Sequence, residues 1–139
     1  MNKSFNITDI NSIAKEILRS VDSKVLLFYG EMGVGKTTLI GEIVKELGCV
    51  TDVSSPTFSI VNEYEITEGL VYHFDFFRIE NEVEVYDIGF EDYTDSDNWI
   101  FIEWPEKLSS LIPEHVNEIH LEKVSENSRN INLKTLIDI

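Results

Sequence analysis

A glycine-rich loop between two apolar segments constrains this chain more than any other feature. Residues 30–37 read Gly-Glu-Met-Gly-Val-Gly-Lys-Thr and match the phosphate-binding pattern G-x-x-x-x-G-K-[ST] at every fixed position. The loop follows an uninterrupted apolar run at residues 25–29, which is typical of a strand buried on both faces. It precedes residues 36–47, whose apolar side chains recur at helical spacing. A strand, a glycine turn and a helix in this order indicate the first half of a βαβ unit.

The composition of the loop suits a nucleotide phosphate. Glycine lets successive backbone N–H groups point at a phosphate that side chains would otherwise block, and the helix N-terminus adds unpaired N–H groups and a positive dipole end. We expect four loop residues to contact the phosphates: Met32, Gly33, Val34 and Gly35. A glycine turn that binds nothing is the alternative, but average composition produces this pattern by chance in only about one chain of this length in two hundred.

The residues that follow the glycines carry the charge and the hydroxyl groups of the motif. Lys36, expected at the solvent-facing start of the helix, would neutralise the β and γ phosphates. The Thr37 hydroxyl would ligate Mg²⁺, and Thr38 can donate a hydrogen bond to the α phosphate. The motif therefore predicts that the chain binds ATP, or a close nucleotide, together with Mg²⁺.

Two acidic residues stand at the ends of predicted strands. Asp75 follows the apolar residues 70–74, and Glu103 follows residues 99–102. Ligands of open α/β sheets bind at the carboxyl edge of the strands, where an acid can hold a phosphate-bound Mg²⁺ directly or through water. Which acid contacts the metal stays open, and Glu103 is our first choice for both metal binding and water activation. We therefore predict Glu103, Asp75 and Lys36 as the catalytic residues.

The rest of the pattern predicts one α/β domain over residues 1–139, a P-loop NTPase-like fold with a mixed parallel and antiparallel sheet flanked by helices. Expected helical segments are 8–21, 80–86 and 106–111, and expected strands are 58–65, 70–74, 99–102, 116–121 and 130–137. Polar loops are expected at 91–98 and 125–129. His73 is interpreted as a hydrogen-bonded core histidine rather than a catalytic one, and Trp104 as a packing residue.

The charge balance bears on the partners that the chain can bind. Twenty-six acidic residues against 11 basic ones give a formal net charge of −15, and the basic residues are scattered singly. Proteins that grip a nucleic-acid backbone need clustered Lys and Arg, so we expect no strong direct binding to RNA or DNA. With one cysteine, Cys49, and no apolar run of about 20 residues, we expect no internal disulfide, no membrane span and a cytoplasmic location.

Four segments taken together are similar to a known family. They are residues 33–38 (Gly-Val-Gly-Lys-Thr-Thr), 55–58 (Ser-Pro-Thr-Phe), 73–75 (His-Phe-Asp) and 103–105 (Glu-Trp-Pro). In this order and spacing they resemble the TsaE (YjeE) family of small bacterial ATPases, over about residues 6–129. The resemblance implies a role in forming threonylcarbamoyladenosine beside the anticodon of tRNAs that read codons beginning with A. It also implies partners, TsaB and TsaD, through which the chain would reach tRNA.

The same resemblance implies roles for particular residues. Lys36 and Thr37 correspond to phosphate and Mg²⁺ contacts, and Asp75 and Glu103 to functional acids, with Glu103 a Mg²⁺ ligand. Residues 55–58 correspond to a switch-like loop near the γ phosphate. The adenine would lie near residues 6–8 and the loop 127–129, which makes Ser128 a nucleotide contact. One departure is Phe77, where the family commonly has tyrosine, so a hydroxyl has no role at this position.

Two other functions fit a P-loop. A small-molecule kinase needs an acceptor pocket and commonly a lid that brings several arginines to the transferred phosphate. This chain has three arginines, Arg19, Arg78 and Arg129, and no arginine-rich segment of lid size. The second alternative is a nucleotide-dependent binding module in which hydrolysis is incidental. We expect an ATP hydrolase of slow turnover that acts as an accessory factor in tRNA modification.

Overall fold

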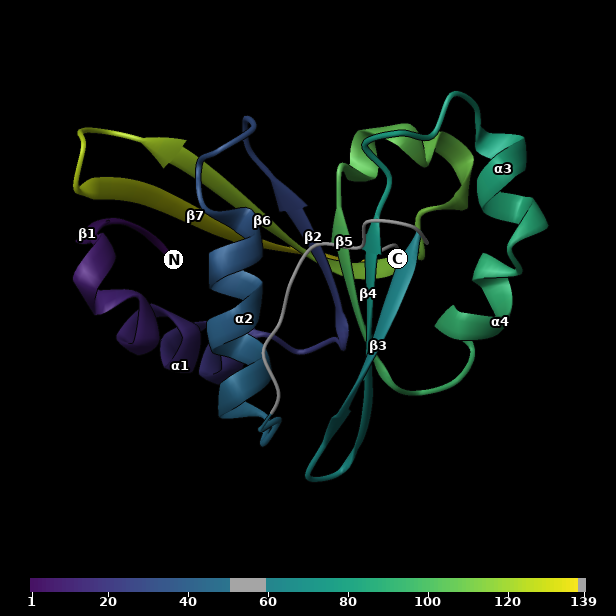
Figure 1. The fold of residues 1–139 in the computed structure, drawn as a ribbon, viewed down its shortest axis with the longest axis horizontal. Helices are drawn as coiled ribbons and strands as arrows, with labels where there is room; N and C mark the ends of the chain where they lie inside the picture. The colour runs from purple at the N-terminus through teal and green to yellow at the C-terminus, as the bar shows by residue number, and fades with distance from the viewer. Residues whose placement is uncertain (51–59, 138–139) are drawn as a thin grey trace.

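The computed structural model describes residues 1–50 and 60–137, and its centre is a mixed sheet (Figure 1). The strands lie in the order β1 (Asn2–Asn6), β7 (Ser128–Ile137), β6 (His115–Lys123), β2 (Val25–Tyr29), β5 (Trp99–Glu103), β4 (Gly69–Asp75) and β3 (Val61–Ile66). The four middle strands are parallel to one another, whereas the pairs β1–β7, β7–β6 and β4–β3 are antiparallel. The predicted α/β class with a mixed sheet is confirmed.

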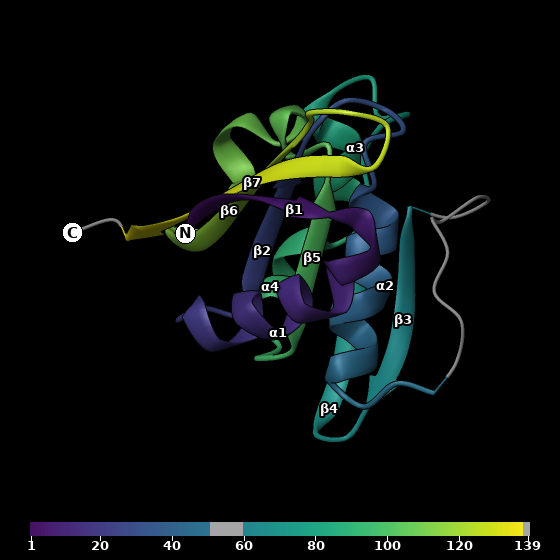
Figure 2. The same cartoon turned by 90° about the vertical axis from the view of Figure 1, so that its left-hand side faces the viewer.

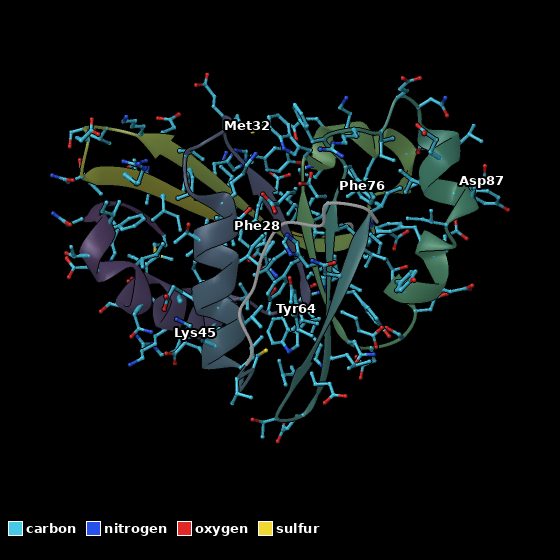
Figure 3. The ribbon with its side chains drawn as sticks, in the orientation of Figure 1. Phe28, Met32, Lys45, Tyr64, Phe76 and Asp87 are labelled. Atoms are coloured by element: carbon cyan, nitrogen blue, oxygen red, sulfur yellow. The ribbon has the colours of Figure 1, made fainter. Side chains whose placement is uncertain are left out.

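Helices cover both faces of the sheet (Figure 1). One face carries α1 (Ile10–Ser20), which follows the 3-10 turn η1 (Ile7–Asp9), and α2 (Lys36–Glu46). The other face carries α3 (Glu82–Asp87), α4 (Phe90–Thr94) and the 3-10 turns η2 (Pro105–Lys107) and η3 (Ser109–Leu111). Neighbouring side chains of a strand point to opposite faces. Phe28 therefore packs in the core below α1 and α2, and its neighbour Leu27 packs in the second core. Phe28 and Phe76, a further member of the second core, are labelled in Figure 3.

The topology gathers chemically important segments at one edge of the sheet. The parallel strands β2, β4, β5 and β6 all end at this edge, and the loop from β2 to α2 starts there. The antiparallel strand β7 begins at the same edge, where its Ser128 pairs with Asn6 at the end of β1 (Figure 2). Residues from both ends of the chain are thus brought next to the glycine loop.

The most apolar predicted elements are confirmed. The strand at 25–29 is found with the predicted bounds, and the strands at 70–74 and 99–102 and the helix at 36–47 agree to within one residue at each end. The strand expected at 58–65 corresponds to β3, Val61–Ile66, and its predicted first residues lie outside the described part of the chain. The predicted switch-like segment 55–58 also lies outside the described residues.

Three parts of the prediction are corrected by the structure. The polar loop expected at 91–98 is wrong, because α4 starts at the buried Phe90, whose ring lies 5.1 Å from the ring of Phe74 and 5.8 Å from that of Phe76. The loop expected at 125–129 is shorter, since β7 already begins at Ser128. Strand β1 was not predicted, because Phe5 is its one buried side chain.

In the part of the chain that the structure describes, no helix is both long enough and apolar enough to cross a membrane.

Candidate functional site

The glycine loop joins the end of β2 to the start of α2 and needs glycine for two reasons. Gly30, Gly33 and Gly35 have φ angles of +154°, +80° and +112°, which residues with a side chain rarely adopt. At Gly30 a Cβ atom would lie 2.8 Å from Cγ1 of Val34 and 2.9 Å from the carbonyl oxygen of Leu121, so the loop packs tightly on β6. At Gly33 and Gly35 a Cβ would meet no atom within 4 Å, so this side of the loop is open to a ligand.

The start of α2 is suited to bind an anion. Gly35 occupies the N-cap position and has no side chain that could cap the helix. The first N–H groups of a helix have no partner within the helix, and together with the helix dipole they attract negative charge. The open side of the loop and the helix N-terminus therefore meet at one point, which is the arrangement that binds phosphate in other proteins.

Lys36 lies inside the site rather than at a solvent-facing helix start, so that prediction is wrong. The residue is only 5% exposed, its Nζ donates a hydrogen bond of 2.5 Å to the carbonyl oxygen of Gly30, and the ammonium lies 3.6 Å from the centre of the Trp104 ring. Burial lowers the pKa of Lys36, and nearby carboxylates, Glu103 foremost, act in the opposite direction. A carbonyl and an aromatic ring only partly replace water around an ammonium group, so an anionic ligand would complement its charge.

Trp104, interpreted from the sequence as a packing residue, packs beside the glycine loop against Lys36. It is one of two non-glycine residues in the described chain with positive φ, at φ 59° and ψ 50°. This left-handed backbone conformation costs roughly 1–2 kcal/mol for a residue with a side chain. The conformation accompanies a ring placed against the ammonium of Lys36 and 5.1 Å from the ring of Phe77.

Glu103 faces the first turn of α2 and is held on two sides. Its carboxylate is buried, with 3% of the residue exposed, and both oxygens lie 3.1 Å from the hydroxyl oxygen of Thr37. On the other side, Oε2 lies 2.7 Å from Nε2 of His73. The sequence placed Glu103 at the end of its strand, but its contacts with Thr37 and His73 join residues 66 and 30 positions away.

Asp75 lies directly beside Glu103. The two residues are paired in register at the ends of the neighbouring parallel strands β4 and β5. The Asp75 side chain accepts a hydrogen bond of 3.0 Å from the backbone N–H of Phe77. Burial raises the pKa of the Asp75 carboxyl, the Glu103 carboxylate adds to the rise, and the Phe77 N–H opposes it. The structure thus brings Lys36, Thr37 and both predicted acids to the same edge of the sheet.

The donor set is compatible with Mg²⁺ bound together with phosphate. The Thr37 hydroxyl and the Glu103 carboxylate are hard oxygen donors 3.1 Å apart, and Asp75 adds a second carboxylate nearby. Among the described residues no group of three or more His, Cys, Asp or Glu side chains could hold a metal ion by itself. Mg²⁺ usually takes one or two protein ligands and completes its octahedron with waters and phosphate oxygens, so these residues fit it.

The structure gives less direct support for the other predicted nucleotide contacts. Met32 is 65% exposed at the tip of the loop (Figure 3), and Thr38 is also exposed. The Val34 side chain is buried, so this residue can offer a ligand only its backbone. The Ser128 hydroxyl lies 2.8 Å from the Ser125 hydroxyl. The segments predicted to lie near adenine are adjacent, since the backbone N–H of Ile7 donates to the carbonyl oxygen of Asn127 at 2.9 Å.

Arg129 ends the loop 127–129 that was expected near the adenine, but nothing in the sequence indicated its contact with the glycine loop. Its Nε donates a hydrogen bond of 2.9 Å to the carbonyl oxygen of Val34, 95 positions away in the chain. Its Nη1 donates to the carbonyl oxygens of Ser125 and Ser128, both at 2.9 Å. The guanidinium therefore fastens the glycine loop to the β6–β7 hairpin.

Replacing Arg129 with methionine is expected to weaken ATP binding about tenfold. The loop would lose a hydrogen bond from a charged donor, and a binding-competent conformation that is populated one tenth of the time lowers the apparent affinity by that fraction. Titration of a fluorescent ATP analogue measures the change, with Arg19→Met, at an exposed position of α1, as the matched control. An affinity within twofold of the parent would show that the loop does not depend on the hydrogen bond from Arg129 to Val34.

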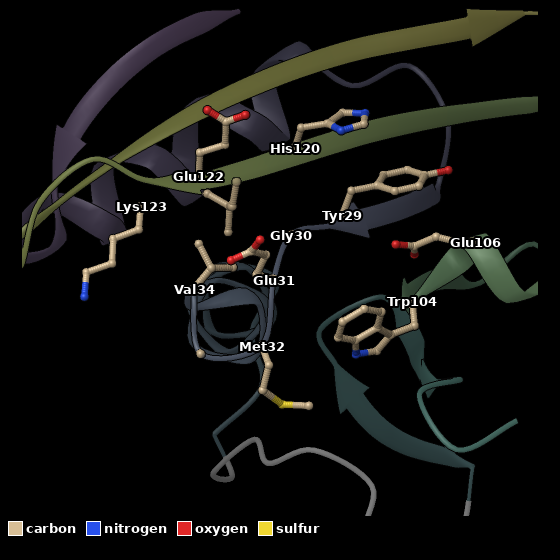
Figure 4. A pocket seen from close by; sticks show the side chains of 12 residues that line it. Tyr29, Gly30, Glu31, Met32, Val34, Trp104, Glu106, His120, Glu122 and Lys123 are labelled. Carbon is tan, nitrogen blue, oxygen red and sulfur yellow. The ribbon is translucent and has the colours of Figure 1, made fainter.

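A cavity of about 800 Å³ lies beside the glycine loop, on the side of β6 (Figure 4). The stacked rings of Tyr29 and His120, with centres 4.5 Å apart, form part of its wall, and Trp104 lies across from them. Burial, together with nearby carboxylates, raises the pKa of Tyr29 to about 12. Three further wall residues are acidic: Glu31, Glu106 and Glu122. Because these carboxylates would repel a phosphate, the open side of the loop at Lys36 is the better phosphate site.

Comparison with known proteins gives a consistent result. The family model described as "Threonylcarbamoyl adenosine biosynthesis protein TsaE" matches residues 5–131. A relative from Rickettsia felis, named tRNA threonylcarbamoyladenosine biosynthesis protein TsaE, is 33% identical over 126 residues, which cover 89% of this chain and 73% of the relative. The protein of the same name from Haemophilus influenzae is 34% identical over 122 residues, covering 86% and 77%.

A solved structure shares the fold. The crystal structure of YdiB from Bacillus subtilis matches with a TM-score of 0.74 at 22% sequence identity, over 99% of this chain and 86% of that one.

Proposed function

This chain belongs to the TsaE family of threonylcarbamoyl adenosine biosynthesis proteins, and we propose that its part in that tRNA modification is to bind and slowly hydrolyse Mg-ATP. The observation that carries the proposal is the meeting of Lys36, Thr37, Asp75 and Glu103 around the start of α2. A lysine, a hydroxyl and two carboxylates at a glycine loop are the groups that a nucleotide triphosphate and its magnesium ion require.

The residues would divide the work as follows. The loop N–H groups and the N-terminus of α2 bind the β and γ phosphates, and Lys36 neutralises their charge. Thr37 and Glu103 would hold Mg²⁺, which when bound neutralises charge on the phosphate oxygens. Of the two acids, Asp75 is partly exposed and can orient an attacking water, while Glu103 is committed to Thr37 and His73. Glu103 is therefore assigned to the metal ion, and it contributes only indirectly to the activation of water.

Turnover by the chain alone is expected to be slow. Fast P-loop hydrolases place an arginine on the transferred phosphate, which accelerates the reaction about 10³–10⁵-fold. The guanidinium of Arg129 is already engaged by three backbone carbonyl oxygens at about 2.9 Å. We therefore propose that the ATPase acts on a complex of TsaB and TsaD and reaches tRNA through it, in keeping with a net charge of −15.

The decisive experiment counts modified adenosines per complex. Purified TsaB and TsaD are supplied with tRNA, ATP and the remaining substrates, with this chain present, absent, or carrying Lys36→Ala. We expect repeated rounds of modification only with the parent chain, and the exposed Lys45→Ala variant should behave like the parent. Multiple turnover in the absence of the chain would remove the proposed role. In a separate arm, the chain alone should bind little tRNA at physiological salt.

A further inference from the structure

A fully buried histidine lies behind the predicted magnesium residues. His73 on β4 has no exposed surface, and its Nε2 lies 2.7 Å from Oε2 of Glu103. Its other ring nitrogen, Nδ1, is buried and has no hydrogen-bond partner in the part of the chain that the structure describes. The imidazole ring thus has a single polar contact, and that contact is to the carboxylate that faces Thr37.

The tautomer of His73 follows from these contacts. An ionised carboxylate only accepts hydrogen bonds, so Nε2 must carry the hydrogen that is donated to Glu103. In this tautomer Nδ1 is an acceptor without a partner. In the other tautomer Nδ1 would be a buried donor without a partner, which is the larger penalty. The orientation of the ring therefore serves one hydrogen bond, from Nε2 to Glu103.

Stability alone gives little reason for a histidine here. A buried polar atom without a partner costs roughly 1–3 kcal/mol, and an apolar side chain of similar size avoids that cost. The neighbouring positions on this face of the sheet, Val71 on the same strand and Phe101 on the paired strand, are apolar and fully buried. A histidine at this place is better explained by what it does to Glu103.

The two contacts on Glu103 come from different elements. The Thr37 hydroxyl approaches from α2 and His73 approaches from β4, so the carboxylate is held between the helix and the sheet. Without His73, the Glu103 side chain would keep its contact with Thr37 but lose the restraint that selects its rotamer. Partners of this kind, behind a metal ligand, commonly change metal affinity 10–100-fold when they are removed.

We propose that His73 is a positioning residue that holds the Glu103 carboxylate toward Thr37 and thereby sets the affinity of the nucleotide site for Mg²⁺. The inference rests on the proposed function, because it takes Thr37 and Glu103 to be the magnesium residues. It assigns His73 no contact with nucleotide or water.

Two substitutions separate positioning from packing. His73→Leu fills the same space with an apolar side chain but removes the N–H that donates to Glu103. His73→Gln keeps an N–H donor at about the same distance from the backbone as Nε2. Binding of a fluorescent ATP analogue is measured in EDTA and then over a Mg²⁺ series, and thermal unfolding is recorded for each variant. We expect His73→Leu to bind nucleotide in EDTA within twofold of the parent but to need about tenfold more Mg²⁺ for its half-maximal effect. His73→Gln should return the Mg²⁺ midpoint to within about threefold of the parent.

The outcomes distinguish this inference from the proposed function. If the parent responds to Mg²⁺ and His73→Leu responds at the same concentration, His73 is a packing residue and the inference is overturned. If Mg²⁺ has no effect on nucleotide binding by the parent, the proposed magnesium site fails and the inference fails with it. Should His73→Leu not fold, His73→Asn replaces it, because its amide nitrogen corresponds to Nδ1 and does not reach Glu103. A parent-like Mg²⁺ midpoint in His73→Asn would overturn the inference equally.

Discussion

Replacing Lys36 with alanine is expected to weaken ATP binding by about two orders of magnitude or more, since hydrogen bonds between charged groups contribute roughly 1.5–3 kcal/mol each and a lysine here would make several. The ammonium is buried at the start of α2, where its partners are the Gly30 carbonyl oxygen and the Trp104 ring. No other lysine of α2 can replace it, because Lys45 lies at the far end of the helix. Titration with a fluorescent ATP analogue measures the loss.

The burial of Lys36 requires a control for stability. The alanine variant loses the contact between the Lys36 ammonium and Trp104, which lowers the free energy of unfolding. It also removes a charge that is costly to bury, as the lowered pKa of Lys36 indicates, and this raises the free energy of unfolding. Thermal unfolding should therefore show a folded protein. Lys45→Ala removes an exposed lysine from the same helix and should leave the ATP affinity unchanged. Near-parental affinity in a folded Lys36→Ala variant would refute the phosphate site.

Replacing Glu103 with glutamine is expected to lower magnesium-dependent ATP turnover about a hundredfold while nucleotide binding in EDTA is retained. The amide keeps the size of the side chain and an oxygen that can accept from Thr37 or His73, but it lacks the charge that holds a divalent cation. Turnover is measured by phosphate release over a Mg²⁺ series, so that a loss of metal affinity and a loss of maximal rate are separated.

Two further variants serve as comparisons for Glu103→Gln. Asp75→Asn tests the neighbouring acid and should lower the maximal rate more than it raises the Mg²⁺ requirement, because Asp75 is the residue assigned to water. Glu65→Gln changes an exposed acid on β3 and should have no effect. If Glu103→Gln hydrolyses ATP as fast as the parent at every Mg²⁺ concentration, Glu103 is no more than the terminal residue of its strand.

The sequence predicted well those elements whose formation depends on local pattern. The apolar run of β2, the glycine loop and the spacing in α2 each contain their own signal, because burial on both faces, phosphate-loop glycines and helical periodicity are all visible in adjacent residues. The positions of Asp75 and Glu103 at strand ends were predicted for the same reason, since each adjoins an apolar run.

The elements that were missed depend on residues far away in the chain. Strand β1 forms through pairing with β7, and its own residues carry little apolar signal. Helix α4 is held by the packing of Phe90 on the aromatic rings of Phe74 and Phe76, which no local pattern reveals. The clamp from Arg129 to Val34 and the contact from His73 to Glu103 likewise join separate strands or loops. Long-range contacts of this kind appear only once the sheet order is known.

The pairing of the first strand with the last has a consequence for how the chain folds. β1 is synthesised before β7 and cannot pair until β7 is made, and a backbone hydrogen bond joins Leu133 to Met1, 132 residues away. Closing a loop of that length costs about 2 kcal/mol more than closing one of ten residues, and non-local pairings of this kind slow folding.

The edge where Phe5 and Asn6 pair with Arg129 and Ser128 is therefore expected to form late. A ligand that binds only the finished edge stabilises it, by about 2.7 kcal/mol at a hundred times its dissociation constant. Under the proposed function, ATP would then stabilise each newly made chain during folding, before it is hydrolysed.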